Sequence, residues 1–314
     1  SVFPEWWYEL GVAAKASGYN YYTKVKINNC REYGEQAYKT QYPYLLMFVT
    51  LQESNWQKLP ACEQDEFLPL ESLSDEQKAA WMNSIKLDKP YEGRDEFFET
   101  HWQRLADLVG NPEIGAEIIY RNLREFSKEG LIYLEPQVTA FGYQTADGTP
   151  IGADDVAKVI NERLAQPDAQ ALDFAWRFQQ AILRFLPNAE QSLIDSFEFT
   201  ARNDPWVAVN MVGREDNDKG YPLRFLPTLR KLRQQHGDVK LSIHAGEVDE
   251  PNHHIRDTLL LGADRIGHGV NLISDPETLL MMRHGPYMVE INLISNLLLE
   301  YVSDYSQHPF PEYL

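Results

Sequence analysis

Apolar and polar positions alternate in blocks through the second half of the chain. Short apolar runs of strand length recur, and the segments between them carry apolar residues at helical spacing. This alternation predicts parallel strands joined by crossover helices, as in an α/β barrel of the TIM type. The strand-like runs start near residues 131, 174, 206, 239, 265 and 287. They give six of the eight strands that such a barrel needs, and we expect the first and last strands to be missing.

Helical periodicity is found between these runs and before them. The predicted helices are 1–17, 94–110, 113–129, 153–166, 188–201 and 222–237. Residues 20–30 alternate aromatic or β-branched with polar side chains, which predicts a hairpin strand. Residues 31–90 look irregular. We therefore predict one barrel domain over residues 1–314, with an insertion at about 20–90 that either covers the substrate or only elaborates the fold.

Composition and charge limit the partners. The chain has 314 residues, 43% of them hydrophobic, which suits a single barrel with a sizeable core. The formal net charge of −18 argues against nucleic-acid polymers and anionic membranes, while a small neutral ligand is compatible with it. The sequence has no run of about eighteen apolar residues, so it predicts no membrane span.

Polar residues stand at the ends of three successive apolar runs. His244 and Glu247 end the first, His268 ends the second, and Asn296 follows the third after Ser295. Because parallel strands present their carboxyl ends on one face, these side chains should converge. A histidine at a strand end is more often structural than a ligand, but two of them with a glutamate in one series favour a functional site. His244 suits a metal ligand, and Glu247 and His268 suit acid–base groups.

The sequence SIHAGE at 242–247, followed by RIGHG at 265–269, resembles the adenosine deaminase family of metal-dependent hydrolases. The closest resemblance is to its secreted branch, the adenosine deaminase-related growth factors, and to their bacterial relatives. Upstream, VNMVGRED is similar to the family segment whose glycine approaches the purine, which here is Gly213. Downstream, a serine–asparagine pair at 295–296 and a later histidine–proline pair resemble another family segment. The resemblance covers most of residues 115–314.

The resemblance implies zinc-dependent hydrolytic deamination of adenosine or 2′-deoxyadenosine to inosine or 2′-deoxyinosine and ammonia. One Zn²⁺ per subunit, with His244 among its ligands, would lower the pKa of a water molecule. His268 would orient and deprotonate that water, Glu247 would protonate N1 of the purine, and Gly213 would let the backbone approach N3. The HxE and PCxxC motifs of cytidine deaminases do not occur in this sequence.

The sequence departs from the family at the metal site. The family takes two zinc ligands from an HxH motif after the first strand and another from an Asp-Asp pair after the last. This sequence has no HxH, and its only such pair, Asp154–Asp155, opens a predicted helix. Asn210 and Asn292–Leu293 stand where the family often has Asp and Cys-Pro. We expect the polypeptide to extend past both ends of this sequence, and these 314 residues alone to bind zinc weakly at most and to show no deamination.

Two other functions stay open. One is deamination of adenine or another aminopurine. The other is a non-catalytic binding or signalling role on the deaminase scaffold, which the missing ligands favour and the retention of His244, Glu247 and His268 opposes. The expected partners are a small purine nucleoside and a second copy of the chain in a homodimer, with no nucleic-acid polymer and no membrane.

The sequence has two cysteines, Cys30 and Cys62. They lack CxxC spacing and have no histidine cluster nearby, which argues against a zinc knuckle. From the residues alone, two free thiols and a disulfide are both open. The secreted branch that the chain resembles carries a cysteine pair in the same region, and this implies a disulfide and an oxidising compartment. We therefore expect a secreted or periplasmic protein, with the cytoplasm as the alternative.

Three other polar groups have a structural interpretation. His253–His254 opens a helix in a polar loop and is expected to be solvated. Glu215–Asp216 follows Gly213 and is also expected to lie in a solvated loop. His308–Pro309 matches the family pattern, but structural capping is the expected role.

Overall fold

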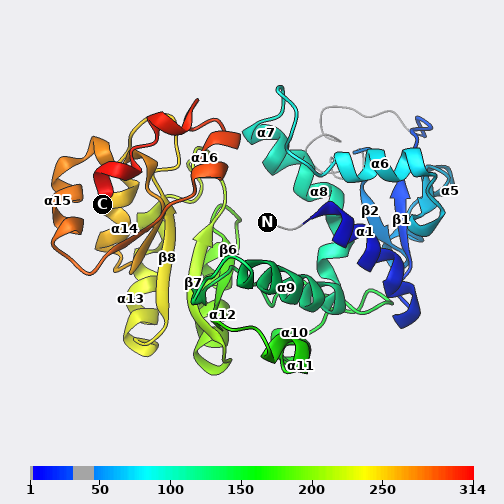
Figure 1. Cartoon of the computed structure of the whole chain (residues 1–314), viewed down its shortest axis with the longest axis horizontal. Coiled ribbons are helices and arrows are strands. Elements are labelled where there is room, and N and C mark those ends of the chain that lie inside the picture. Colours follow the sequence, from blue (N-terminus) through cyan, green and yellow to red (C-terminus); the bar gives the residue numbers. More distant parts are fainter. Residues whose placement is uncertain (1–2, 31–45) are drawn as a thin grey trace. The chain divides into compact units, whose positions relative to one another are not determined.

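The computed structural model describes residues 3–30 and 46–314, and contacts within the chain divide it into two compact units (Figure 1). Unit 1 is Ser1–Ile132 with Ala140–Phe174, and unit 2 is Tyr133–Thr139 with Ala175–Leu314. Residues 31–45 of the predicted insertion lie outside the described residues. The expectation of one barrel domain with an insertion stays a prediction.

Unit 2 is built on a parallel sheet with the strand order β10-β9-β8-β7-β6. These strands are β6 Phe178–Leu183, β7 Trp206–Val212, β8 Lys240–Ala245, β9 Arg265–His268 and β10 Met288–Glu290. Before β6, the short strand β5 (Ala175–Trp176) pairs in parallel with β4 (Tyr133–Leu134), and a bridge from Gln137 to Gln179 continues this pairing. Strands therefore lie at all six predicted positions, in the order of an α/β barrel of the TIM type.

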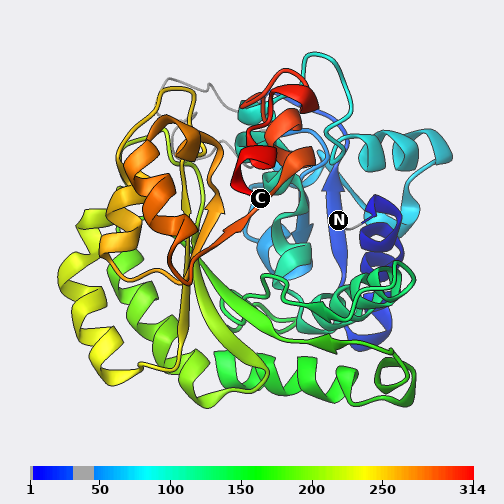
Figure 2. The ribbon, with the colours of Figure 1, turned by 60° about the vertical axis from the view of Figure 1, so that its left-hand side comes forward.

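The outer face of this sheet is apolar and covered by helices. Helices α12 (Ala189–Arg202) and α13 (Leu226–Gln235) lie along the strands (Figure 2). The buried cluster between them includes Leu193, Phe197, Val209, Met211, Leu229, Leu232, Leu241 and Ile243. Side chains alternate faces along a strand, so a strand that turns Leu241 and Ile243 outward turns Ser242 and His244 to the other face. Each fully buried Leu, Ile or Phe in this cluster contributes about 1.5–3 kcal/mol.

The opposite face of the sheet carries a buried polar cluster. Glu135, just after β4, forms an ion pair at 2.8 Å with Arg265 of β9. Gln179 of β6 donates to Glu135 at 3.1 Å and to Glu290 of β10 at 3.3 Å, and it accepts from Asn210 of β7 at 2.6 Å. Strands from both ends of the sheet thus share one cluster, so the sheet curls strongly around its polar face.

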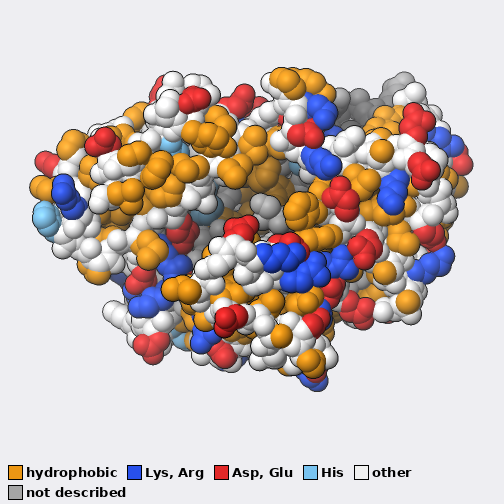
Figure 3. Space-filling model, in the orientation of Figure 1, with side chains coloured by type: hydrophobic (Ala, Val, Ile, Leu, Met, Phe, Trp, Pro, Cys, Tyr) orange, Lys and Arg blue, Asp and Glu red, His pale blue; other side chains and the backbone are white. Residues whose placement is uncertain are grey.

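Exposed apolar side chains follow the edge strand β10. Met288, Ile291, Ile294 and Leu298 are each more than one-third exposed, on β10, on helix α16 (Leu293–Leu298) and on the link between them. Figure 3 shows hydrophobic side chains, in orange, gathered on the visible face of each unit. Within the described part of unit 2, this end of the sheet is therefore apolar as well as exposed.

Unit 1 contains a three-stranded antiparallel sheet in the order β2-β1-β3. Its strands are β1 Tyr21–Lys24, β2 Thr50–Gln52 and β3 Phe67–Pro69. The strand predicted at 20–30 is thus present but short. The expectation that residues 31–90 are irregular is wrong for the described part, which also contains α6 (Asp75–Asn83). Three-residue strands are too short to show a period of two, so only their pairing with β1 reveals them.

Three of the remaining helices match predicted ones: α1 Pro4–Ala13, α9 Pro112–Ser127 and α10 Ala153–Leu164. Two others, α14 His254–Leu260 and α15 Pro276–Arg283, lie between the predicted strands, and three short helices were not predicted: α4 Glu53–Trp56, α5 Ala61–Gln64 and α11 Pro167–Gln170. The helix predicted at 94–110 is broken into α7 (Arg94–Glu96), a π turn at Phe97–His101, α8 (Trp102–Leu105) and a 3₁₀ turn. Among the described helices, none is both long and apolar enough to cross a bilayer.

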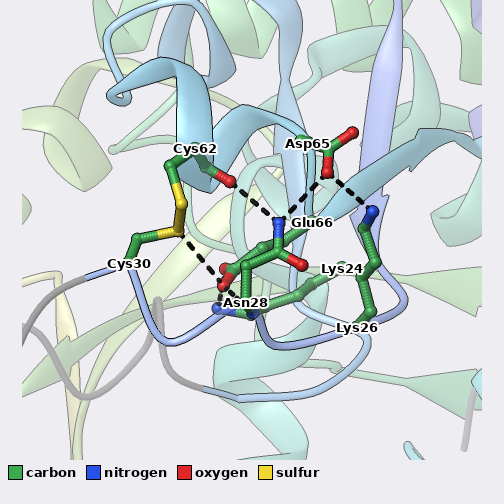
Figure 4. Close-up of a disulfide and its surroundings, with 7 residues drawn as sticks. All are labelled: Lys24, Lys26, Asn28, Cys30, Cys62, Asp65 and Glu66. Atoms are coloured by element: carbon green, nitrogen blue, oxygen red, sulfur yellow. Dashed lines mark hydrogen bonds and ion pairs between the residues drawn. A yellow bond between two sulfur atoms is a disulfide. The ribbon is translucent and has the colours of Figure 1, made fainter.

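Cys30 and Cys62 form a disulfide with an S–S distance of 2.08 Å, which confirms the expected pairing (Figure 4). The bridge joins the segment after β1 to helix α5. Beside it, Lys24 and Glu66 form a buried ion pair at 2.6 Å, and the backbone amide of Asn28 donates to Glu66 at 2.7 Å. The chain after β1 is therefore held by both a covalent bond and a buried charge pair.

We expect the double variant Cys30→Ser, Cys62→Ser to have a lower free energy of unfolding. The bridged residues are 32 positions apart, and the chain-entropy model gives about 3.7 kcal/mol for a loop of this size. Urea unfolding of the oxidised protein and the variant measures the difference. A reducing agent should destabilise the parent protein and leave the variant unchanged. Equal stability of the oxidised parent protein and the variant would contradict the prediction.

Candidate active site

His244, Glu247 and His268 come together at the carboxyl ends of β8 and β9. The register of the two strands pairs His244 with Gly267 and Ala245 with His268. One nitrogen or oxygen atom from each of the three side chains lies within 4.8 Å of the others. The two imidazole rings are 4.7 Å apart between centroids, and Nδ1 of His268 is 3.2 Å from Oε1 of Glu247. The structure thus brings together three side chains of the types that bind metals and move protons.

Glycines beside the histidines provide space for His244 rather than for His268. A Cβ on Gly267 would lie 2.4 Å from the ring of His244, so a larger residue there would displace that ring. His268 itself has a φ of +64°, a left-handed conformation that is costly for any residue with a side chain. Such a conformation persists only where the surrounding structure imposes it, and it is common at functional sites.

The turn after β8 is held on both sides by a buried ion pair. Arg184, which follows β6 and is fully buried, donates through Nη1 to the carbonyl of His244 and through Nη2 to that of Gly213 at 3.2 Å. Its Nη2 is also 3.7 Å from Glu215. The Glu215 carboxylate accepts from the amides of Gly246 at 3.1 Å and Glu247 at 2.9 Å. We call Arg184 and Glu215 the turn clamp.

The expectation that Glu215 and His254 are solvated is wrong for both side chains. Glu215 is 4% exposed and bonds to Nδ1 of His254 at 2.6 Å. Burial by itself raises the pKa of Glu215, but the hydrogen bond from His254 and the charge of Arg184 outweigh it and lower that pKa. Glu215 is therefore a carboxylate. An arginine at the end of a strand was the available signal, because a buried guanidinium requires an acidic partner.

Both histidines of the site are held neutral. Burial lowers the pKa of His244 well below its usual value, and the neighbouring His268 and Arg184 lower it further. Burial lowers the pKa of His268 to about 4, against the raising effect of Glu215. A neutral imidazole keeps a lone pair, which is the form that binds zinc or accepts a proton.

A second pair of polar residues reaches His268 from the C-terminal part of the chain. Asn296, in α16, places its amide nitrogen 2.8 Å from Nδ1 of His268. Nε2 of His308 is 3.1 Å from the amide oxygen of Asn296, and the backbone amide of Phe310 donates to Nδ1 of His308 at 3.1 Å. His308 thus has a local capping bond, as expected, and also a contact with Asn296 that sequence reasoning missed.

Gly213 ends β7 with a φ of +99°, and a Cβ there would lie 2.6 Å from the ring of Phe185. Both features require glycine. Its carbonyl accepts from Arg184, so the turn clamp joins the end of β7 to the turn after β8. The contact of Gly213 with a purine and the roles of Glu247 and His268 in catalysis stay predictions.

Comparisons with known proteins identify the family of this chain. The family model for adenosine deaminase matches residues 65–314. An adenosine deaminase of Aedes albopictus is 27% identical over 220 residues, which are 68% of this chain and 40% of that protein. The chain thus spans less than half the length of that relative.

Solved structures share the fold. An adenine deaminase from Arthrobacter aurescens gives a TM-score of 0.61 at 16% identity, over 77% of this chain and 70% of that one. An amidohydrolase from Burkhoderia ambifaria with bound Zn gives 0.58 at 20% identity, over 77% and 64%. The family model covers most of the chain, including the strands and turns that carry His244, Glu247 and His268. The chain belongs to the adenosine deaminase family.

Proposed function

We propose that this protein hydrolytically deaminates adenosine or 2′-deoxyadenosine. The observation that carries the proposal is the convergence of His244, Glu247 and His268 within 4.8 Å at the ends of two neighbouring strands. Membership of the adenosine deaminase family supports it, as does the relative from Aedes albopictus, which is an adenosine deaminase.

We further propose that His244 holds one Zn²⁺. A neutral imidazole is an ordinary zinc ligand, and a carboxyl group and a second imidazole lie within 4.8 Å of it, so the donor types fit this ion. One solved relative has bound Zn. When present, the ion would lower the pKa of water in the site. His244 supplies only one bond, and the HxH motif that gives further ligands in the family does not occur in the sequence.

The protein groups divide the reaction between them. Water adds to C6 of the purine while N1 takes a proton from Glu247, and the proton that the water loses returns to Glu247. The bond from C6 to the amino nitrogen then breaks, and this nitrogen leaves as ammonia with the proton of the new C6 hydroxyl. The Glu247 carboxyl supplies the proton to N1, because a buried carboxyl can act as a general acid near neutral pH. His268 orients the attacking water. Gly213 lets the backbone come close to N3, since no side chain blocks it.

Adenine or another aminopurine is the second candidate substrate, because the relative from Arthrobacter aurescens is an adenine deaminase. The protein to test is the product of the complete gene. We expect it to release ammonia from adenosine and 2′-deoxyadenosine faster than from adenine, and to contain one zinc per chain. Faster release from adenine would favour the second candidate. No release from any purine would contradict both.

The His244→Ala variant tests the ligand role directly. We expect its zinc content, measured by atomic emission on protein dialysed against a zinc buffer, to fall well below that of the parent protein. His284, an exposed histidine, provides the matched control, and His284→Ala should keep the parental zinc content. Full zinc occupancy in His244→Ala would refute the assignment.

We also propose an oxidising compartment, outside the cell or in the periplasm. The Cys30–Cys62 disulfide supports this location, because such bonds persist where thiols are not kept reduced. The homodimer stays a prediction.

A further inference from the structure

We propose that neutral His268 carries its proton on Nε2, and that Asn296 and His308 are positioning residues that fix this tautomer. The assignment follows from the direction of a hydrogen-bond chain that begins at the backbone amide of Phe310. Only its catalytic consequence rests on the proposed function.

The chain starts from a donor whose direction is fixed. The backbone amide of Phe310 lies 3.1 Å from Nδ1 of His308, and a backbone N–H can only donate. Nδ1 of His308 is therefore the acceptor, and the proton of this neutral, buried ring is on Nε2. This N–H donates to the amide oxygen of Asn296, which lies 3.1 Å from Nε2.

The orientation of the Asn296 side-chain amide fixes which group faces His268. Its oxygen accepts from His308, so its NH₂ group is the end that lies 2.8 Å from Nδ1 of His268. The inverted amide would set NH₂ against the N–H of His308, with two donors facing each other. All three side chains are 5% exposed or less, so no bulk water relieves such a mismatch.

Nδ1 of His268 is consequently an acceptor, and the ring's proton is on Nε2. The same nitrogen lies 3.2 Å from Oε1 of Glu247. The shorter contact, with the amide nitrogen of Asn296, fixes the role of Nδ1 as an acceptor.

The catalytic consequence concerns the role of His268. With a proton on Nε2, neutral His268 offers that nitrogen as a donor, so it holds the attacking water by donating a hydrogen bond to its oxygen. The resemblance to the family had implied that His268 also removes a proton from the water. The tautomer assigned here leaves His268 as the orienting group only.

The ¹⁵N NMR spectrum of protein labelled at histidine tests the tautomer without any assay of activity. The protein is the complete gene product at pH 7. The signals of His268 are assigned by their loss in His268→Gln. We expect Nε2 to have the chemical shift of a protonated nitrogen and Nδ1 that of an unprotonated one. The reverse pattern would overturn the inference.

Substitutions in the hydrogen-bond chain should move the proton. In Asn296→Asp the carboxylate replaces the donor beside Nδ1 with an acceptor, so we expect the proton to move to Nδ1. His308→Ala removes the group that orients the amide and should give a mixture of tautomers, whereas His308→Gln can still donate to Asn296 and should restore Nε2–H. Asn292→Asp is the control, because it adds the same charge one helical turn earlier, at a side chain that donates to the carbonyl of Glu290.

An unchanged tautomer in both Asn296→Asp and His308→Ala would overturn the role of these two residues. If Asn296→Asp does not fold, the parent protein and the two His308 variants decide the question. Under the proposed function, His308→Ala should lower kcat with little change in KM, and His308→Gln should recover it. An Nε2–H tautomer in a protein that deaminates no purine would refute the function and leave the inference standing. An Nδ1–H tautomer in an active deaminase would refute the inference and leave the function standing.

Discussion

Glu247→Gln is expected to lower kcat for adenosine by about 10²–10⁴-fold, the usual contribution of a general acid or base. Glutamine has the shape of glutamate but has no acidic proton to deliver to N1. The backbone amide of residue 247 would still donate to Glu215, so the turn after β8 should keep its conformation. Ammonia release under saturating adenosine measures kcat.

The control for this prediction is Glu250→Gln, which makes the same change at an exposed position in the same loop and should leave kcat near the parental value. Zinc content and the free energy of unfolding should be unchanged in Glu247→Gln, which separates a chemical defect from a folding defect. Near-normal turnover in Glu247→Gln would refute the acid role of this residue.

Arg184→Met should destabilise the protein by about 3–5 kcal/mol, the cost of breaking a buried ion pair from one side. The substitution leaves Glu215 buried with one charge uncompensated, and it removes the donor to the carbonyls of His244 and Gly213. The double variant Arg184→Met, Glu215→Leu removes both charges and should recover much of the loss, because apolar pairs replace buried ion pairs at little cost. Urea unfolding measures both differences.

Amide hydrogen exchange distinguishes the turn clamp from a merely stabilising pair. The amides of Gly246 and Glu247 donate to Glu215, so they should exchange slowly in the parent protein and rapidly in the double variant, even if its stability recovers. Arg214→Met breaks a partly exposed ion pair with Asp216 in the same loop and should cost no more than about 1 kcal/mol. Slow exchange of both amides in the double variant would show that Glu215 does not hold the turn.

The barrel strands could be predicted because a buried parallel strand is a nearly continuous apolar run, and helices of regular periodicity separate these runs. The alternation in Leu241–His244 even assigns the faces of β8. By contrast, β2 and β3 of unit 1 have three residues each, so no run reveals them before they pair with β1. The helical pattern at 94–110 did not reveal the break at the π turn, because a π turn keeps residues of ordinary helical character.

In the candidate site, too, residues at strand ends could be predicted, and residues placed by tertiary contacts could not. His244, Glu247 and His268 stand where strands end, so their convergence follows from the geometry of a parallel sheet. The clamp residue Glu215 could not be found in this way. Its acidic neighbours make it look solvated, and its burial depends on Arg184, which follows a different strand. His308 was noticed only as a cap because its contact with Asn296 forms through tertiary packing.

The division of unit 2 along the sequence has a consequence for how the protein folds. Its first strand, β4, is made before residues 140–174 of unit 1, and the ion-pair partner of Glu135 in the polar cluster is Arg265, 130 residues later. Contacts between residues so distant in sequence carry a large loop-closure cost and slow folding. On the ribosome, β6, β7 and β8 can pair in order as they emerge. Glu135, by contrast, must wait for β9, so we expect the curl of the sheet to be the last step in the folding of unit 2.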